Sequence, residues 1–295
     1  MTTRFESKAA AAWRRATSAL LPLAAGLLLG GCGSAPPPPS AALQAATVNS
    51  QSAARAWARG DLALARNLYE RALAGAESIE DFPLAGATLL NLALVQSRAG
   101  DAAGAMARVD RLLAAPQRYG AALQAAAATR KALLHLDKPD LEAALDWAGR
   151  AEAVCAAPCA QAAALANLRA HVAWQRADAP GSARHAEQAL AAATQQAQAA
   201  EQANALRQLG RARGALGLAD QAAADLVQAL AIDQRLGLAD RVALDLVTAA
   251  EIERQRGRVA AAREFYDRAR VVYLATGQAA QAEAVRAKLA ALAPL

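Results

Sequence analysis

The chain has 295 residues, of which 55% are hydrophobic and only 4% aromatic. This composition argues against a thick core of large side chains and favours closely packed helices, and no alternating run of β-branched and aromatic residues predicts a strand. The formal charge is +6, but residues 1–31 carry +3 of it. Because the remainder has no basic cluster, we expect no nucleic-acid binding.

Residues 1–31 read as a targeting segment rather than as part of the fold. A basic region ends at Arg14-Arg15, and the apolar stretch from Ala16 to Leu29 is too short to span a bilayer. The tetrapeptide Leu29-Gly30-Gly31-Cys32 that follows resembles the signal of bacterial lipoproteins. The resemblance implies cleavage before Cys32 and attachment of a diacylglycerol to its thiol. An ordinary secretory leader with an incidental cysteine is the alternative.

The residue after the cysteine indicates in which membrane such a lipoprotein is retained. It is Gly33 and not the Asp that is typical of inner-membrane retention, so the resemblance implies an outer-membrane anchor facing the periplasm. Residues 32–45 would form a linker, since the four prolines from Pro36 to Pro39 favour an extended polyproline spacer.

The stretch from Leu206 to Leu230 carries the pattern on which the rest of the chain is built. Apolar positions recur at intervals of three and four on both sides of Gly217, which predicts two amphipathic helices joined by a tight turn. The small residues Gly210, Ala222 and Ala229 leave room for close helix packing, while leucines fill the space around them, at positions 206, 209 and 226.

This order of residues resembles the tetratricopeptide repeat, with its W-x2-L-G-x2-Y and A-x3-F elements. Leu206-x2-Leu209-Gly210 and Ala222-x3-Leu226 match, whereas Arg213 stands where the repeat has Tyr. The resemblance implies an all-α, right-handed solenoid of helical hairpins.

Related turns recur along residues 46–277, close to positions 60, 100, 139, 177, 217 and 257. The regular spacing of 38 to 40 residues predicts six hairpins and excludes a single long coiled coil. Standard tetratricopeptide repeats have 34 residues, so each helix here is expected to be longer by roughly a turn. Residues 278–295 place Val285, Leu289 and Leu292 on one face and predict a capping helix.

Cys155 and Cys159 lie between the third and fourth hairpins. In an exported protein these thiols would meet an oxidising environment, and a structural disulfide across so short a loop would contribute roughly 2 kcal/mol. Reduced packing cysteines, or a redox or metal role, are the alternatives. The Cys-x3-Cys spacing differs from thioredoxin-like and zinc motifs, and no histidine is close in sequence.

The chain contains no motif that predicts catalysis. His135, His171 and His185 fall in different helices without the spacing of a helical metal site, and no phosphate loop or Gly-x-Ser-x-Gly sequence is present. The carboxylates are scattered among basic residues. We therefore expect neither an enzyme nor a bound metal or cofactor.

The expected binding site is the concave groove, which the first helix of each hairpin lines in the resembling family. Counting from the repeat pattern places polar and cationic residues in its C-terminal half, namely Asn167, His171, Trp174, Gln175, Asn204, Arg207, Arg211, Glu251, Arg254 and Gln255. The N-terminal half would instead present Trp57, Leu90, Leu94, Ser97, Arg98 and Leu133.

Two pairs in this groove are spaced i, i+4 on adjacent helices: Asn167 with His171, and Arg207 with Arg211. They resemble the carboxylate clamp by which some tetratricopeptide domains hold the C-terminus of a partner peptide, because guanidinium groups bind carboxylates in a bidentate way. Ordinary soluble surface is the alternative interpretation of the two arginines.

These features predict a non-catalytic scaffold that binds a protein or peptide partner at the outer membrane. Its architecture is similar to pilotin-type lipoproteins that assist the assembly of pili or secretion channels. A regulator that docks on peptidoglycan synthases or hydrolases is the alternative, and nothing in the sequence separates the two.

Overall fold

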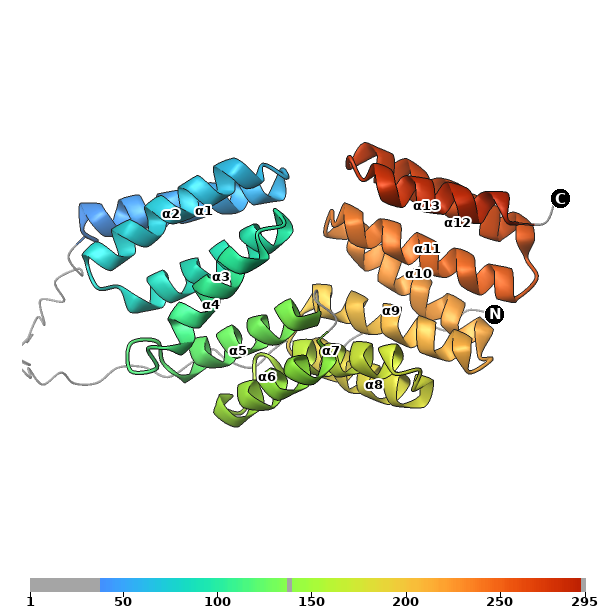
Figure 1. The fold of residues 1–295 in the computed structure, drawn as a ribbon, viewed down its shortest axis with the longest axis horizontal. Coiled ribbons are helices and arrows are strands. Elements are labelled where there is room, and N and C mark those ends of the chain that lie inside the picture. The colour runs from blue at the N-terminus through green and yellow to red at the C-terminus, as the bar shows by residue number, and fades with distance from the viewer. Residues whose placement is uncertain (1–37, 137–139, 293–295) are drawn as a thin grey trace, which may run out of the picture. The chain divides into compact units, whose positions relative to one another are not determined.

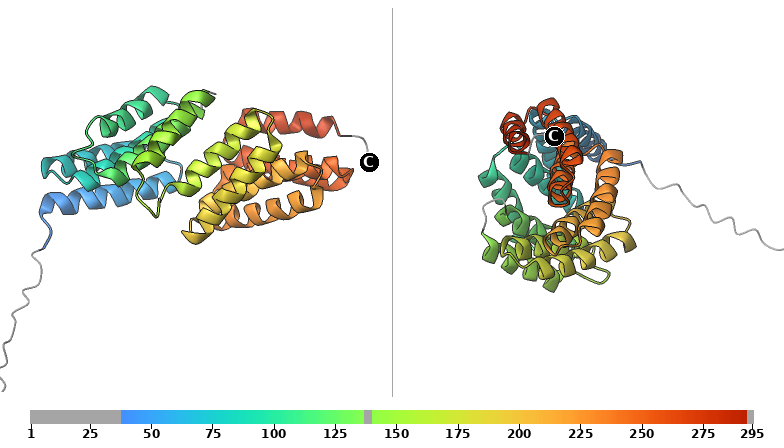
Figure 2. Two further views of the ribbon diagram at one scale, coloured as in Figure 1. Left: turned by 90° about the horizontal axis from the view of Figure 1, so that it is seen from below. Right: turned by 90° about the vertical axis from the view of Figure 1, so that its right-hand side faces the viewer.

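The computed structural model describes residues 38–136 and 140–292, and within these ranges the chain is helical, without strands. Consecutive helices pack against one another in series (Figures 1 and 2). The helices are α1 (Ala41–Ala58) with α2 (Leu62–Ser78), α3 (Phe82–Arg98) with α4 (Ala102–Leu113), α5 (Ala121–Leu136) with α6 (Leu141–Val154), α7 (Ala162–Gln175) with α8 (Ala179–Gln195), α9 (Ala199–Ala215) with α10 (Ala219–Arg235), α11 (Ala239–Gln255) with α12 (Val259–Ala275), and finally α13 (Ala279–Ala290).

The predicted fold class is confirmed, since six helical hairpins are followed by one further helix. That last helix, α13, packs on α12 and buries Ala282 and Val285 in the terminal core. The array starts at Ala41, ahead of the position 46 expected from the repeat pattern. The leader, the lipidation residue Cys32 and the turn at position 139 lie outside the described residues.

The hairpin turns fall where the glycine pattern places them. Gly60, Gly100, Gly217 and Gly257 all have positive φ angles, a left-handed conformation that glycine adopts without steric cost. A backbone hydrogen bond across the turn then ends each helix. In the first hairpin the Asp61 amide donates to the Ala56 carbonyl oxygen at 3.0 Å.

Several connections between hairpins use the same turn, which the 40-residue pattern does not reveal. Positive φ recurs at Glu80, Ala197, Gly237 and Gly277, each 20 residues from a hairpin turn. The structural period is therefore one helix with its turn. Most helices have 17 residues, which accounts for the excess over the 34-residue repeat.

Aspartates begin many of the helices in the first two thirds of the chain. Asp81 accepts a hydrogen bond from the Leu84 amide at 2.9 Å, as predicted from the Asp-Phe-Pro sequence, and Pro83 occupies the first turn. Four further aspartates form the same cap, at positions 61, 101, 140 and 178.

The Leu206–Leu230 hairpin has the packing that its small residues predict. A Cβ atom on Gly210 would lie 2.6 Å from Leu226 Cγ and 3.2 Å from the Ala222 carbonyl oxygen, so only glycine allows α9 and α10 to approach this closely. Leu226 is 1% exposed, and Ala222 and Ala229 are fully buried. Alanines fill equivalent places along the whole array, as the composition suggested.

Among the helices that the structure describes, none combines the length and apolar character needed to cross a membrane.

Candidate functional site

All of the predicted C-terminal groove residues lie on the first helices of hairpins four to six. These helices, α7, α9 and α11, contact one another directly, α7 with α9 and α9 with α11. We call eight of these residues the α7–α9–α11 face. They are Asn167, His171 and Trp174 from α7, Asn204, Arg207 and Arg211 from α9, and Glu251 and Arg254 from α11.

Arg207 is a structural residue of this face. Its side chain is 7% exposed and all three guanidinium nitrogens are engaged. Nε donates to Asp245 Oδ1 at 2.5 Å, Nη1 donates to Asn204 Oδ1 at 2.9 Å, and Nη2 pairs with Asp233. Because the side chain is buried and already paired with two carboxylates, Arg207 joins α9, α10 and α11 instead of forming the second half of a clamp.

The two carboxylates around Arg207 are wholly buried. Burial raises the pKa of Asp245 to about 6, against the opposing effect of Arg207 and with a further raising effect of Asp233. Burial likewise raises the pKa of Asp233, although Arg207 and Arg241 both oppose it. Arg207 therefore pairs with two carboxylates whose charged forms are destabilised by burial.

A chain of hydrogen bonds extends this network to α7. Asn167 donates through Nδ2 to the Glu201 carboxylate at 2.8 Å and to its carbonyl at 3.1 Å. Asn204 donates to the same carboxylate at 3.2 Å and accepts from Arg207. Asn167 and Asn204 thus position α7 against α9, and the Asn167 Oδ1 atom is buried without a hydrogen-bond partner in the described structure.

Arg211, His171 and Trp174 form a different kind of group, which we call the Arg211 cluster. The Arg211 guanidinium lies 4.6 Å from the centroid of the Trp174 ring, a cation–π contact between α9 and α7. Within residues 38–136 and 140–292 no carboxylate pairs with Arg211. It is half-buried, and burial, followed by the nearby charge of Arg207, lowers the pKa of its guanidinium.

His171 is the neutral member of the cluster. Burial, with a smaller contribution from Arg211, lowers the pKa of its imidazole below the usual value. Its Nε2 atom lies 3.2 Å from Gln175 Nε2. The cluster therefore offers one unneutralised cation on an aromatic ring, beside a neutral imidazole, and this arrangement suits a carboxylate group.

The charged side chains in the α11 part of the face are paired. Arg254 donates to Glu251 at 3.1 Å and is 53% exposed, and Lys288 of α13 pairs with the same carboxylate. Glu251 also accepts a hydrogen bond from the Tyr266 hydroxyl, and burial, together with this hydrogen bond, raises the pKa of the phenol. Glu251 is thus a link between α11, α12 and α13.

The departure of Arg213 from the repeat pattern has a structural explanation. Its Nη1 donates to both oxygens of Asp225, at 3.0 and 2.8 Å, and its Nη2 contacts Glu187 at 3.1 Å. A charged pair between α9 and α10, extended to α8, therefore takes the place of the tyrosine.

The N-terminal candidates are more apolar and partly covered. Trp57 and Leu90 pack against the core of the first two hairpins, and Leu133 packs against the core around α6 and α7. Arg98 pairs with Asp240. These residues offer no unpaired charge comparable to Arg211.

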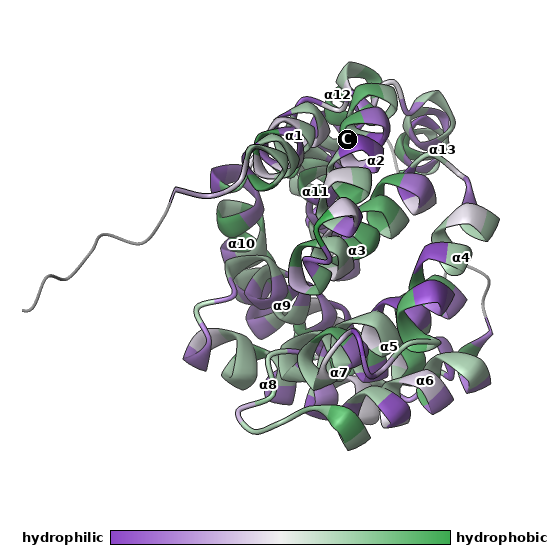
Figure 3. Cartoon of the chain, turned by 90° about the vertical axis from the view of Figure 1, so that its left-hand side faces the viewer, coloured by the Kyte–Doolittle hydropathy of each residue, from purple (hydrophilic) through white to green (hydrophobic). Residues whose placement is uncertain are grey.

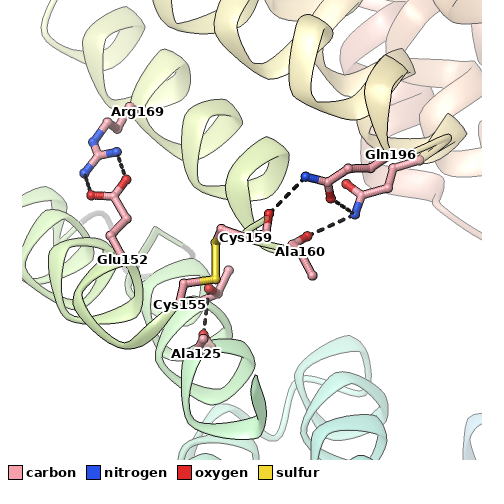
Figure 4. The surroundings of a disulfide bond; sticks show 9 residues. Ala125, Glu152, Cys155, Cys159, Ala160, Arg169 and Gln196 are labelled. Atoms are coloured by element: carbon pink, nitrogen blue, oxygen red, sulfur yellow. Dashed lines mark hydrogen bonds and ion pairs between the residues drawn. A yellow bond between two sulfur atoms is a disulfide. The ribbon is translucent and has the colours of Figure 1, made fainter. Parts of the chain in front are cut away.

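The structure joins Cys155 and Cys159 in a disulfide in the connection between α6 and α7, with Cα atoms 5.3 Å apart (Figure 4). The Cys159 carbonyl accepts a hydrogen bond from Gln196 Nε2 at 3.0 Å, and the Ala160 carbonyl accepts from Gln198 Nε2 at 2.9 Å. In the described part of the chain, no three His, Cys, Asp or Glu residues are grouped to hold a metal ion.

The sequence pattern did not predict three acidic partners of the groove residues, namely Glu201, Asp233 and Asp245. Arg207 is 26 residues from Asp233 and 38 from Asp245. The second distance is close to one repeat, so a search for opposite charges at repeat spacing would have found Asp245. Asp233 has no such signal.

No protein-family model and no curated protein matches this chain. Its fold is similar to the APC/C hetero-tetramer Cut9–Hcn1 (TM-score 0.60, 15% identity, 80% of this chain and 42% of that chain). It is also similar to a Rap protein complexed with competence and sporulation factor (0.59, 13%, 81% and 69%).

A third similar structure is a signal-transduction ATPase with a tetratricopeptide-repeat sensor from Pyrococcus horikoshii (TM-score 0.57, 11% identity, 81% of this chain). The chain spans 37% of that ATPase, and only 42% of the Cut9–Hcn1 chain. These likenesses show the tetratricopeptide-repeat fold.

Proposed function

We propose that this chain, which has the tetratricopeptide-repeat fold, is a non-catalytic scaffold that binds a protein or peptide partner on the α7–α9–α11 face. Repeat arrays of this kind present extended surfaces on which a segment of another protein can lie. The similar Rap protein is complexed with competence and sporulation factor, which is consistent with this use of the fold.

The observation that carries the proposal is the unpaired charge of Arg211. The other arginines of the face are committed, Arg207 to Asp233 and Asp245, and Arg254 to Glu251. A partner carboxylate would neutralise Arg211 without breaking any ion pair of the scaffold. His171 and Trp174 would then limit how that carboxylate can lie.

The test is in-cell crosslinking and capture of the full chain, comparing Arg211→Ala with Arg254→Ala. We expect a defined partner that is captured by the unaltered chain and by Arg254→Ala and is lost in Arg211→Ala. Equal capture by all three forms would reject Arg211 as the binding residue. The partner's identity then decides between pilus or secretion assembly and the control of peptidoglycan enzymes.

The proposed setting is the periplasmic face of the outer membrane, with Cys32 as the lipid anchor. This rests on the leader sequence, since residues 1–37 lie outside the described structure. More than one acyl chain is needed for stable anchoring. Cys32→Ala should release the protein from the membrane fraction, as measured by sedimentation. A variant that still sediments with the outer membrane would contradict the lipoprotein assignment.

A further inference from the structure

Two connections in the array are longer than the others. The segment 114–120 joins α4 to α5, and the segment 155–161 joins α6 to α7, whereas the remaining helices are separated by three or four residues. Both long segments connect one hairpin to the next. They differ in what holds them in place.

The first long segment is fixed by an aromatic side chain. Tyr119 is 4% exposed and packs edge-on against Phe82, with ring centroids 6.3 Å apart. Arg118 lies over the Phe82 ring at 5.6 Å. This segment is therefore part of the N-terminal core.

The second long segment has no such anchor. None of residues 155–161 is buried, and positions 156–158 are exposed. Its C-terminal end is tied to the connection between α8 and α9 through Gln196 and Gln198. Its N-terminal end, Cys155, is the residue that closes α6. The disulfide thus adds a second covalent link, beside the backbone, between the end of α6 and a segment held by the C-terminal hairpins.

At the joint that this segment crosses, the two neighbouring helices pack less directly than at the other joints. Among consecutive helices, α6 and α7 make the fewest contacts. Their shared core sets Leu165 and Leu168 of α7 against alanines of α6. The ion pairs Glu152–Arg169 and Glu142–Arg176, and the pair Arg98–Asp240 between α3 and α11, are partly exposed, and such pairs stabilise little.

We propose that the Cys155–Cys159 disulfide is a redox-controlled clamp on the joint between the α1–α6 unit and the α7–α13 unit. In the oxidised form the clamp restricts movement of one unit against the other. A dithiol reductant attacks one sulfur through a thiolate, forms a mixed disulfide and displaces the other cysteine as thiolate. Its second thiol then releases the protein.

The exchange is balanced within the two reactants. The dithiol loses two electrons and two protons and becomes a disulfide, while Cys155 and Cys159 gain them and become thiols. Both cysteines are partly exposed, so a reductant can reach them. Movement at this joint does not depend on the identity of a binding partner.

The experiment measures distances by double electron–electron resonance on the full chain. Spin labels are attached to keto amino acids, so that the cysteines stay unmodified. One pair of labels, at positions 74 and 228, spans the joint. A control pair, at positions 74 and 122, lies within α1–α6. The residues replaced, Ala74, Ala122 and Gln228, are all exposed. Each pair is measured in oxidised protein, after treatment with a dithiol, and in the Cys155→Ser, Cys159→Ser variant.

We expect reduction to broaden the distance distribution across the joint at least twofold, and the serine variant to show the same breadth without reductant. The control pair should keep its distribution in all three samples. An unchanged distribution across the joint would overturn the proposal. Broadening of both pairs would also overturn it, because the disulfide would then support folding in general rather than the joint.

Discussion

The two ends of the array are stabilised by different chemistry. In the N-terminal core the buried residues are mainly leucines, valines and alanines with Tyr69 and Tyr119, and the buried polar groups of the first two hairpins, Thr88 and Gln96, are uncharged. All five buried charged residues of the described structure lie on α9, α10 and α11, namely Arg207, Asp225, Asp233, Asp245 and Glu253. Figure 3 shows the contrast, with α3 largely hydrophobic and hydrophilic stretches on α9 and α10.

The candidate site lies in the C-terminal hairpins because polar and charged side chains are concentrated there. Polar residues that pair with one another, such as Arg207 with Asp245, hold the helices in register without supplying a free group. Arg211, one turn further along α9, is left unpaired beside them. The network that stabilises the hairpins and the cluster that is free to bind are therefore adjacent but separate.

The largest expected effect is that of Arg207→Ala. It removes the cation that pairs with both buried carboxylates, Asp233 and Asp245, and breaking a buried ion pair in this way typically costs about 3–5 kcal/mol. Urea unfolding should show this loss, and hydrogen exchange should rise in α9–α11 while α1–α4 stay protected. Arg254→Ala is the matched control, since its side chain is 53% exposed. A loss below about 1 kcal/mol for Arg207→Ala would contradict the structural role of Arg207.

In the N-terminal hairpins the corresponding test is Leu89→Ala. Leu89 is fully buried, so its truncation removes packed methyl groups and leaves a cavity, at a cost of about 3 kcal/mol. Urea unfolding measures the loss, with Leu64→Ala, whose residue is 40% exposed, as the control. Similar losses for the two variants would mean that the core is assigned incorrectly.

A smaller effect is the pH dependence of stability, which we expect from Asp245 in the C-terminal hairpins and not from the uncharged N-terminal core. Because burial raises the pKa of Asp245 from the ordinary 3.8 to about 6, the folded chain holds a proton that the unfolded chain releases between these values. The contribution of this group to stability is complete below about pH 4 and is lost as pH rises through 6, a change on the order of 2 kcal/mol.

The measurement is the difference in unfolding free energy between the unaltered chain and Asp245→Asn, from pH 4 to pH 7. We expect the difference to change in favour of the variant as pH rises. Leu89→Ala should show a difference that is independent of pH. A constant difference for Asp245→Asn would show that Asp245 is already ionised throughout this range.

Much of the fold follows from local patterns that the sequence displays. The turn at Gly217 and the contact of Gly210 with Leu226 could be predicted because both depend on residues within one hairpin. The 20-residue period was harder to see, because Glu80 and Ala197 occupy left-handed positions where other turns have glycine.

The site was predicted less completely. The structure places Arg211 and Trp174 on neighbouring helices, as the repeat pattern predicts, and adds their mutual contact. Arg207 was grouped with them because its spacing to Arg211 is that of one helical turn. Its partners Asp233 and Asp245 come from two other helices, and sequence periodicity within α9 carries no information about them.

The most direct test of Arg211 as the binding group is to measure thermal unfolding and partner capture on one preparation of Arg211→Ala. Arg211 contacts the Trp174 ring but pairs with no described carboxylate, so we predict an unfolding midpoint within about 2 °C of the unaltered chain, together with the loss of the captured partner. Retained capture, or a loss that occurs only together with unfolding, would contradict the assignment of Arg211 as the binding group.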